Sequence, residues 1–240
     1  MKKNILIAFC VVASLSACNE LNNVVNPFPE IGSSTPSTLE IANGLKAALE
    51  KGTINGVKDL SAIGGYANHE LYKIHFPPSA KKVETTLRGI GLDSEVDNVV
   101  ALLNKAAENA VTEAKPIFIN AIQQMTISDA KAILFGADTA ATAYLEDKTR
   151  ADLYSKFNPH IEKSLNEVNA TKYWNQIISQ YNKLPMVEPI NPDLNSYVTN
   201  RAIDGLFLKI SKEEKSIRED PISRTSDILK KVFNYASENK

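Results

Sequence analysis

The chain has 240 residues, of which 43% are hydrophobic and 23% charged, with 27 Lys and Arg against 28 Asp and Glu. A net charge of -1 excludes a strongly basic nucleic-acid-binding protein, because phosphate binding requires a clear excess of Lys and Arg. The hydrophobic fraction excludes wholesale disorder, and the two cysteines exclude a disulfide-rich scaffold or a four-cysteine zinc site.

The first 17 residues are typical of a bacterial export signal. Lys2 and Lys3 precede an apolar stretch, Ile5 to Leu15, that is too short to span a bilayer, since a spanning helix needs about 20 apolar residues. We therefore predict that residues 1–17 are a signal peptide.

The sequence Leu15-Ser16-Ala17-Cys18 has the form of a lipobox. A thiol can form the thioether to diacylglycerol, and small residues before it suit the signal peptidase. We expect cleavage before Cys18 and acylation of Cys18, which would anchor the chain firmly. Asn19, rather than Asp, follows Cys18, which favours the outer membrane, with the domain facing the periplasm. Once Cys10 is removed with the signal, no free thiol would remain.

Residues 18–37 are interpreted as the lipidated cysteine and a flexible linker, because Pro27, Pro29 and Pro36 break helices. Residues 38–240 are predicted to form one all-helical domain. The expected fold is all-α, a single irregular bundle of about nine or ten helices behind a lipidated tether. Helices are predicted over residues 37–52, 54–63, 79–90, 94–125 with an end or kink at Pro116, 126–136, 138–148, 150–168, 171–182, 193–218 and 225–237.

Local signals set these boundaries. Capping boxes are predicted at Ser37 with Glu40 and at Thr126 with Asp129, and further N-caps at Asp138 and Asp193. Helix ends are predicted at Gly52, Gly64 and Gly136, and a kink or break at Pro159. Two segments are expected to be extended connections, Tyr72 to Phe76 and Leu184 to Pro192.

The helix predicted over residues 171–182 carries the most unusual local composition. It holds Tyr173 and the only tryptophan, Trp174, which shares a helical face with Tyr181; Asn175 and Asn182 share the next face. Aromatic and amide faces side by side are consistent with a ligand groove or a partner surface. The alternative is a packed helix whose polar atoms find hydrogen bonds within the fold.

The helix predicted over residues 193–218 is apolar around its axis near residues 202–210, which is typical of a central helix. Arg201 and Asp204 lie at this point and are candidates for a polar core. They are interpreted either as a structural ion pair or as part of a site, because an unpaired buried charge is very costly.

No catalytic motif was found, so whether the protein is an enzyme stays open, with a non-enzymatic role favoured. His69, His75 and His160 have no metal-ligand spacing, and no phosphate-binding loop or nucleophile elbow is present. We predict no cofactor, no metal site and no nucleic-acid partner.

The chain resembles a bacterial family known as domain of unknown function 4197. The resemblance rests on segments spread in order over most of residues 39–233, among them Gly44 to Leu49, Lys115 to Met125, Ala130 to Leu134, Tyr173 to Asn175, Tyr181 to Pro185, Asn191 to Leu194 and Ala202 to Phe207. It implies an exported, mostly helical and often lipidated protein, and it implies no activity or catalytic residue.

Three hypotheses for function follow. The first is a periplasmic lipoprotein that serves as a non-enzymatic binding or envelope-interaction module, with a surface near Trp174 and Tyr181. The second is a carrier of a small apolar or lipid ligand, which an apolar cavity with a mouth would favour. The third is an envelope hydrolase with a site assembled from distant residues. The expected partners are the membrane, through the lipid on Cys18, and an envelope protein or a small apolar ligand.

Overall fold

The computed structural model describes residues 35–183, 185–191 and 193–239. These residues form the helices α1 (Thr38–Ser61), α2 (Lys81–Gly89), α3 (Asp93–Ala110), α4 (Ala114–Gln124), α5 (Ile127–Leu134), α6 (Ala140–Glu167), α7 (Ala170–Tyr181), α8 (Leu194–Glu219) and α9 (Asp227–Glu238). Short 3-10 helices are η1 (Pro78–Ala80), η2 (Val111–Glu113) and η3 (Pro221–Ser223). No strand occurs in this part of the chain, so the prediction of an all-α fold with about nine or ten helices is confirmed.

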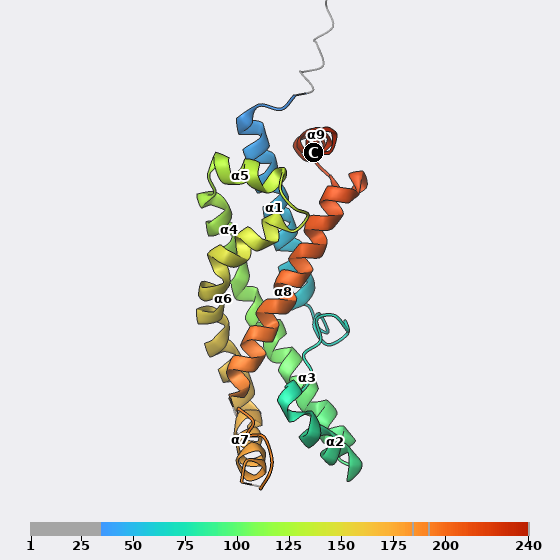
Figure 1. The fold of residues 1–240 in the computed structure, drawn as a ribbon, viewed down its shortest axis with the longest axis vertical. Helices are drawn as coiled ribbons and strands as arrows, with labels where there is room; N and C mark the ends of the chain where they lie inside the picture. The colour runs from blue at the N-terminus through green and yellow to red at the C-terminus, as the bar shows by residue number, and fades with distance from the viewer. Residues whose placement is uncertain (1–34, 184, 192, 240) are drawn as a thin grey trace, which may run out of the picture. The chain divides into compact units, whose positions relative to one another are not determined.

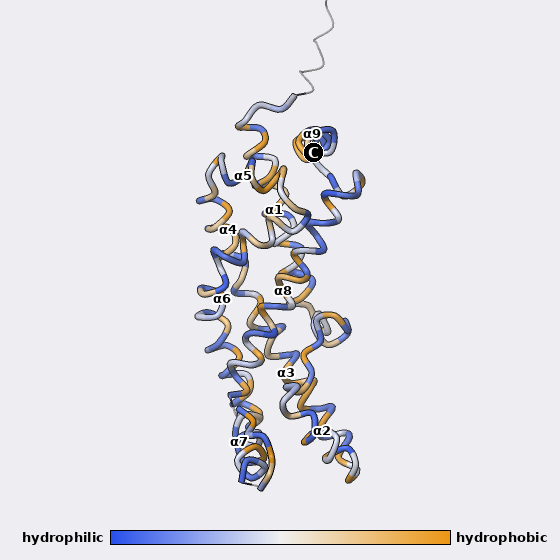
Figure 2. Tube along the Cα trace, viewed as in Figure 1, coloured by the Kyte–Doolittle hydropathy of each residue, from blue (hydrophilic) through white to orange (hydrophobic). Residues whose placement is uncertain are grey.

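The central helix is α8. It packs most extensively against α6 and also contacts α1, α3, α7 and α9. Figure 1 shows α5 and α9 near the start of α1, at the upper end, and α2 and α7 at the lower end. Hydrophobic and hydrophilic residues alternate along the helices (Figure 2), and the buried apolar residues of all nine described α-helices form one core. Within the described residues, no helix combines the length and hydropathy needed to cross a membrane.

The first helix is longer than predicted. We expected one helix to end at Gly52 and a second to follow, but α1 continues to Ser61. Gly52 and Gly56 lie against α8, where a methyl group on Gly56 would be 3.5 Å from Lys209. Close packing of the two helices therefore outweighs the poor helix propensity of glycine, about 1 kcal/mol per residue.

The helix α6 replaces two predicted helices. It runs through Pro159 without a break, and its N-cap residue is Thr139 rather than Asp138. Proline removes one hydrogen bond, to the carbonyl of Ser155, and both residues are exposed. Water can therefore satisfy that carbonyl, which explains why the helix continues.

Other local predictions are confirmed. Both capping boxes form, with Ser37 Oγ accepting from Glu40 N at 3.2 Å and Thr126 Oγ1 accepting from Asp129 N at 3.1 Å. Asp193 caps α8 by accepting from the backbone N–H of Ser196 at 2.9 Å. The segment 72–76 is a non-helical connection, as is the described stretch 185–191. These caps fix where the chain enters α1, α5 and α8.

Candidate functional site

An apolar groove of about 420 Å³ lies between α2 and α3 on one side and α7 on the other. One wall is formed by Val83, Leu87, Leu92, Val96, Val99 and Leu102. The opposite wall is formed by Val168, Ala170, Tyr173, Trp174 and Ile177. Phe76 completes the lining together with Glu95 and Asn98, so 12 of its 14 residues are apolar or aromatic. The groove reaches the surface, because Tyr173 and Val168 are 60% and 41% exposed.

Helical periodicity builds both walls. Val83 and Leu87 are four residues apart on α2, and Val96 and Val99 are three apart on α3, so each pair shares a face. Tyr173, Trp174 and Ile177 share a face of α7 in the same way. The side chains are too far apart across the groove to close it, and a hollow remains instead of a packed core.

The helix α2 is held on α3 by a group of charged side chains around Arg88. Its guanidinium donates to Glu84 on its own helix at 3.2 Å and to Asp97 on α3 at 2.8 Å. The hydrogen bond to Asp97, with that to Glu84, raises the pKa of Arg88. Gly91, with φ of 86°, makes the tight turn between the two helices. This wall is therefore attached to the domain chiefly through α3.

The connection between α1 and η1 places Phe76 at the groove. Asn104, fully buried on α3, accepts from Ile74 N and donates to Ile74 O, both at 2.8 Å. Glu108, one turn later, accepts from Tyr66 N at 3.2 Å, and the Tyr66 hydroxyl donates to Ala202 O of α8 at 2.7 Å. Burial raises the pKa of Tyr66, which stays a neutral donor. These bonds hold the connection between α1 and η1 in place against both α3 and α8.

Trp174 is a buried side chain of the groove. It is 5% exposed and meets Phe76 edge to face, with ring centroids 5.8 Å apart. Its Nε1 atom is buried and has no hydrogen-bond partner among the described residues. Buried indole N–H groups usually find an acceptor, so this donor is an exception that requires an explanation.

A second, polar cavity of about 270 Å³ also has Trp174 in its lining. Its other residues are Pro77, Ser79, Asn191, Asp193, Leu194, Ser196, Tyr197, Asn200 and Arg201. The Tyr197 hydroxyl donates to His75 O at 3.1 Å, and burial raises the pKa of Tyr197. We call this cavity the polar pocket. It lies next to the groove along the chain, because Phe76 lines the groove and the following residue, Pro77, lines the polar pocket.

The aromatic and amide residues predicted to form a surface on α7 lie in different surroundings. Tyr173 and Trp174 line the groove, whereas Tyr181 is half-buried against the core. Asn175 is exposed and outside the groove lining. Asn182 holds the following loop, accepting from Ile190 N at 2.8 Å and donating to Ile190 O at 2.9 Å. The structure therefore places two of these five residues at the groove.

The expectation of a buried polar core at Arg201 and Asp204 is wrong. Their side chains are 45% and 41% exposed and lie 3.6 Å apart. Asp204 makes its shorter contact, at 2.5 Å, with Arg150 of α6. The face of α8 that carries them is turned to solvent, so no desolvated charge has to be neutralised there. Arg201 nevertheless lines the polar pocket. Cys18, the predicted lipidation site, lies outside the described residues.

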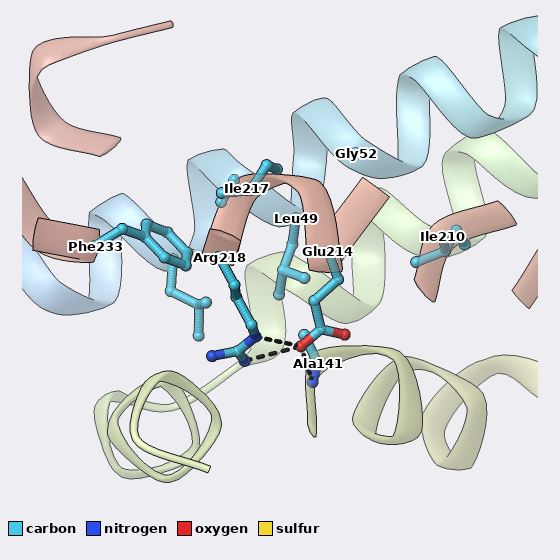
Figure 3. Close-up of a pocket in the computed structure, with 10 residues that line it drawn as sticks. Leu49, Gly52, Ala141, Ile210, Glu214, Ile217, Arg218 and Phe233 are labelled. Carbon is cyan, nitrogen blue, oxygen red and sulfur yellow. Dashed lines mark hydrogen bonds and ion pairs between the residues drawn. The ribbon is translucent and has the colours of Figure 1, made fainter. Parts of the chain in front are cut away.

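Sequence reasoning missed a buried ion pair between Glu214 and Arg218 on α8 (Figure 3). Glu214 accepts from the backbone N–H groups of Ala141 and Thr142 at 3.0 and 2.8 Å, at the start of α6. Arg218 donates to the carbonyls of Ile133 and Leu134 at 2.9 and 3.1 Å, at the end of α5. The adjoining cavity measures about 20 Å³. The pair therefore caps two helix ends, and its position four residues apart on α8 was the only sequence signal.

The described residues contain no group of three or more His, Cys, Asp or Glu placed to hold a metal ion. Neither the groove nor the polar pocket is lined by a described His or Cys. Chemically, the arrangement can shelter an apolar group in the groove and form polar contacts in the neighbouring pocket.

Comparison with known proteins places the chain in a family. No curated protein and no solved structure matches it. A family model described as "Protein of unknown function (DUF4197)" matches residues 35–234, which include every helix that lines the groove. The chain therefore belongs to the DUF4197 family of proteins of unknown function.

Proposed function

We propose that this protein is an exported lipoprotein, anchored through Cys18 to the cell envelope, whose helical domain binds a small apolar ligand in the groove. The groove carries the proposal. Its volume of about 420 Å³ falls within the range of small-molecule sites, and 12 of 14 lining residues are apolar or aromatic. A packed bundle needs no such hollow, since protein interiors are close-packed.

The groove favours a carrier of a small apolar ligand over a flat partner surface. A straight alkyl chain placed in it would lose its contact with water and gain about 0.8 kcal/mol per buried CH₂ group. Affinity is therefore expected to rise about fourfold with each added carbon until the groove is full. A flat protein-binding surface would not produce that dependence on chain length.

Ligand binding in the groove can be measured by the fluorescence of Trp174. It is the only tryptophan of the chain and lines the groove, so its fluorescence reports directly on occupancy. We expect saturable changes when straight-chain fatty acids of increasing length are titrated below their micelle concentrations. Absence of saturable binding at every length would contradict the proposal.

Two variants of α3 localise the binding. Val99 lines the groove and Ala101 is an exposed residue outside its lining. Val99→Trp should fill the groove and abolish binding, whereas Ala101→Trp should leave it unchanged. Because each variant adds a second tryptophan, binding is compared by calorimetry. Equal affinity in both variants would place the ligand elsewhere.

The anchor is tested separately. The wild-type protein should fractionate with membranes and carry an acyl mass on its first mature residue. Cys18→Ser should remove that mass and release the domain from the membrane fraction. A Cys18→Ser protein that fractionates as the wild type does would contradict lipid anchoring while leaving the groove proposal untouched.

A further inference from the structure

The unpartnered indole N–H of Trp174 indicates that the ligand of the proposed groove is not purely hydrocarbon. An alkane would leave this buried donor without an acceptor, which is unfavourable for any buried polar group. A ligand with an oxygen acceptor near the end of its chain would satisfy it. The inference rests on the proposed function, since it concerns what occupies the same groove.

The polar pocket offers a place for that oxygen. Trp174 lines both cavities, and the chain passes from one to the other between Phe76 and Pro77. An apolar compartment and a polar one that share a side chain suit a ligand with an apolar body and a polar head.

The charges of the polar pocket favour an anionic head. Arg201 is the only Lys or Arg among the described residues that line it, and Asp193 is the only acid. Asp193 is already engaged, because its carboxylate caps α8 by accepting from Ser196 N at 2.9 Å. Arg201 is 45% exposed and lies 3.6 Å from Asp204, which is closer to Arg150; the other partner of Arg201 is the Tyr197 hydroxyl, which also lines this pocket. A guanidinium in this position can turn to an incoming carboxylate or phosphate.

We infer that the ligand is a single-chain anionic amphiphile, whose alkyl chain lies in the groove, whose head accepts a hydrogen bond from Trp174 Nε1, and whose negative charge faces Arg201. The Nε1 atom is enclosed in this structure, so the inference requires Trp174 to shift as the head enters. Carboxylate and phosphate share this chemistry, and a fatty acid and a lysophospholipid are two sources of it.

The test compares heads on one chain length. The full chain carrying Cys18→Ser is titrated by calorimetry with dodecanoate, dodecanol and dodecyltrimethylammonium. We expect dodecanoate to bind about tenfold more tightly than dodecanol, since hydrogen bonds to charged groups are the stronger kind, and the cationic amphiphile to bind weakest. Comparison with a lysophosphatidate of the same chain then separates the two sources, the tighter ligand being the one the site is built for.

Three variants assign the preference. Arg201→Gln should reduce the ratio of dodecanoate to dodecanol affinity to about one, because the ionic contribution is lost. Lys172→Gln removes an exposed cation of α7 that lines neither cavity and should keep the ratio. Trp174→Phe retains an aromatic ring without the N–H and should weaken both ligands about tenfold.

The outcomes separate this inference from the proposed function. If wild type binds dodecanoate and dodecanol equally, or prefers the cationic amphiphile, the anionic head is wrong although the groove still binds apolar chains. If Arg201→Gln and Lys172→Gln give the same ratio of dodecanoate to dodecanol affinity, Arg201 does not recognise the anionic head. If no amphiphile binds at all, both the inference and the proposed function fail.

Discussion

The carboxylate of Glu214, on α8, caps the N-terminus of α6. The N-cap residue of α6, Thr139, makes no side-chain cap hydrogen bond, and the carboxylate of Glu214 takes the first free backbone N–H groups instead. Arg218 balances the charge of Glu214 at 2.8 Å while it caps α5. Both side chains are under a tenth exposed, so neither charge can be stabilised by water.

We therefore predict that Glu214→Ala lowers the free energy of unfolding by about 3–5 kcal/mol, because it leaves Arg218 as an unpaired buried charge. Glu219→Ala is the control, since Glu219 forms an exposed pair with Lys215 at 3.8 Å and its loss should change stability by about 0.5 kcal/mol or less. Urea unfolding followed by circular dichroism measures both. Similar losses in the two variants would show that the buried pair is not a structural clamp.

Sequence alone could identify some of these residues and not others. Trp174 drew attention because it is the only tryptophan and sits among tyrosines and amides, and it does line the groove. Val99 and Val96 read equally well as core residues, because an apolar stripe does not reveal whether the facing helix fills the space opposite. The capping role of Glu214 had no local signal beyond its spacing to Arg218, because the backbone N–H groups that it caps are more than 70 residues away in the chain.

Two helical glycines, Gly44 and Gly89, differ in whether their surroundings leave room for a side chain. At Gly44 of α1 an added methyl group would lie 2.7 Å from Val232 Cγ2 of α9, whereas at Gly89 of α2 nothing lies within 4 Å. We predict that Gly44→Ala destabilises by about 1–3 kcal/mol through overpacking, although alanine favours helix. Gly89→Ala should stabilise by about 0.4–1 kcal/mol.

Thermal and urea unfolding of these two variants test the contact between α1 and α9. Adding Val232→Ala to Gly44→Ala should recover part of the loss, because the smaller side chain makes room for the new methyl group. If Gly44→Ala stabilises the protein as Gly89→Ala does, the two helices do not approach as closely as described.

The same helices are joined by a pH-dependent contact. Lys231 Nζ of α9 donates to Glu40 Oε1 of α1 at 2.7 Å. This bond, with those from the Ser37 backbone and hydroxyl, lowers the pKa of Glu40 from 4.5 to about 2. A carboxyl with a lowered folded pKa stabilises the fold above its unfolded pKa. That stabilisation is lost as the pH falls from 4.5 towards 2.

We predict that Lys231→Met flattens this part of the stability profile. The free energy of unfolding of wild type should fall more steeply than that of the variant between pH 4.5 and 2, and the two curves should converge at the acid end. Lys230→Met, which removes an exposed neighbour 3.7 Å from Asp227, should keep the wild-type slope. Parallel profiles for Lys231→Met and wild type would contradict the assignment.

Helix boundaries were predictable where a local signal decides them. The capping boxes at Ser37 and Thr126 and the cap at Asp193 all form. The predicted ends at Gly52 and before Arg150 failed because packing against α8 carries α1 and α6 past residues that would stop an isolated helix. The groove itself depends on how α3 and α7 are placed relative to each other, which no local signal encodes.

The outer helices of the two groove walls, α2 and α7, pack on different neighbours, and those neighbours, α3 and α6, contact each other. Helix α2 packs mainly on α3, whereas α7 packs mainly on α6 and to a lesser extent on α8. Both lie at the lower end in Figure 1, away from α5 and α9. A ligand in the groove would contact both α2 and α7, so that either helix could open only when the ligand leaves.

This arrangement predicts a pattern of hydrogen exchange. A ligand at 100 times its dissociation constant adds about 2.7 kcal/mol to any opening that destroys its site, which slows exchange about a hundredfold. With dodecanoate bound, amides of both α2 and α7 should slow together, while those of α4 and α5 that exchange by local opening should not change. Val99→Trp should remove the effect. If amides of only one wall slow, the ligand does not contact both walls. If amides near α5 slow, the ligand binds at the other end of the domain.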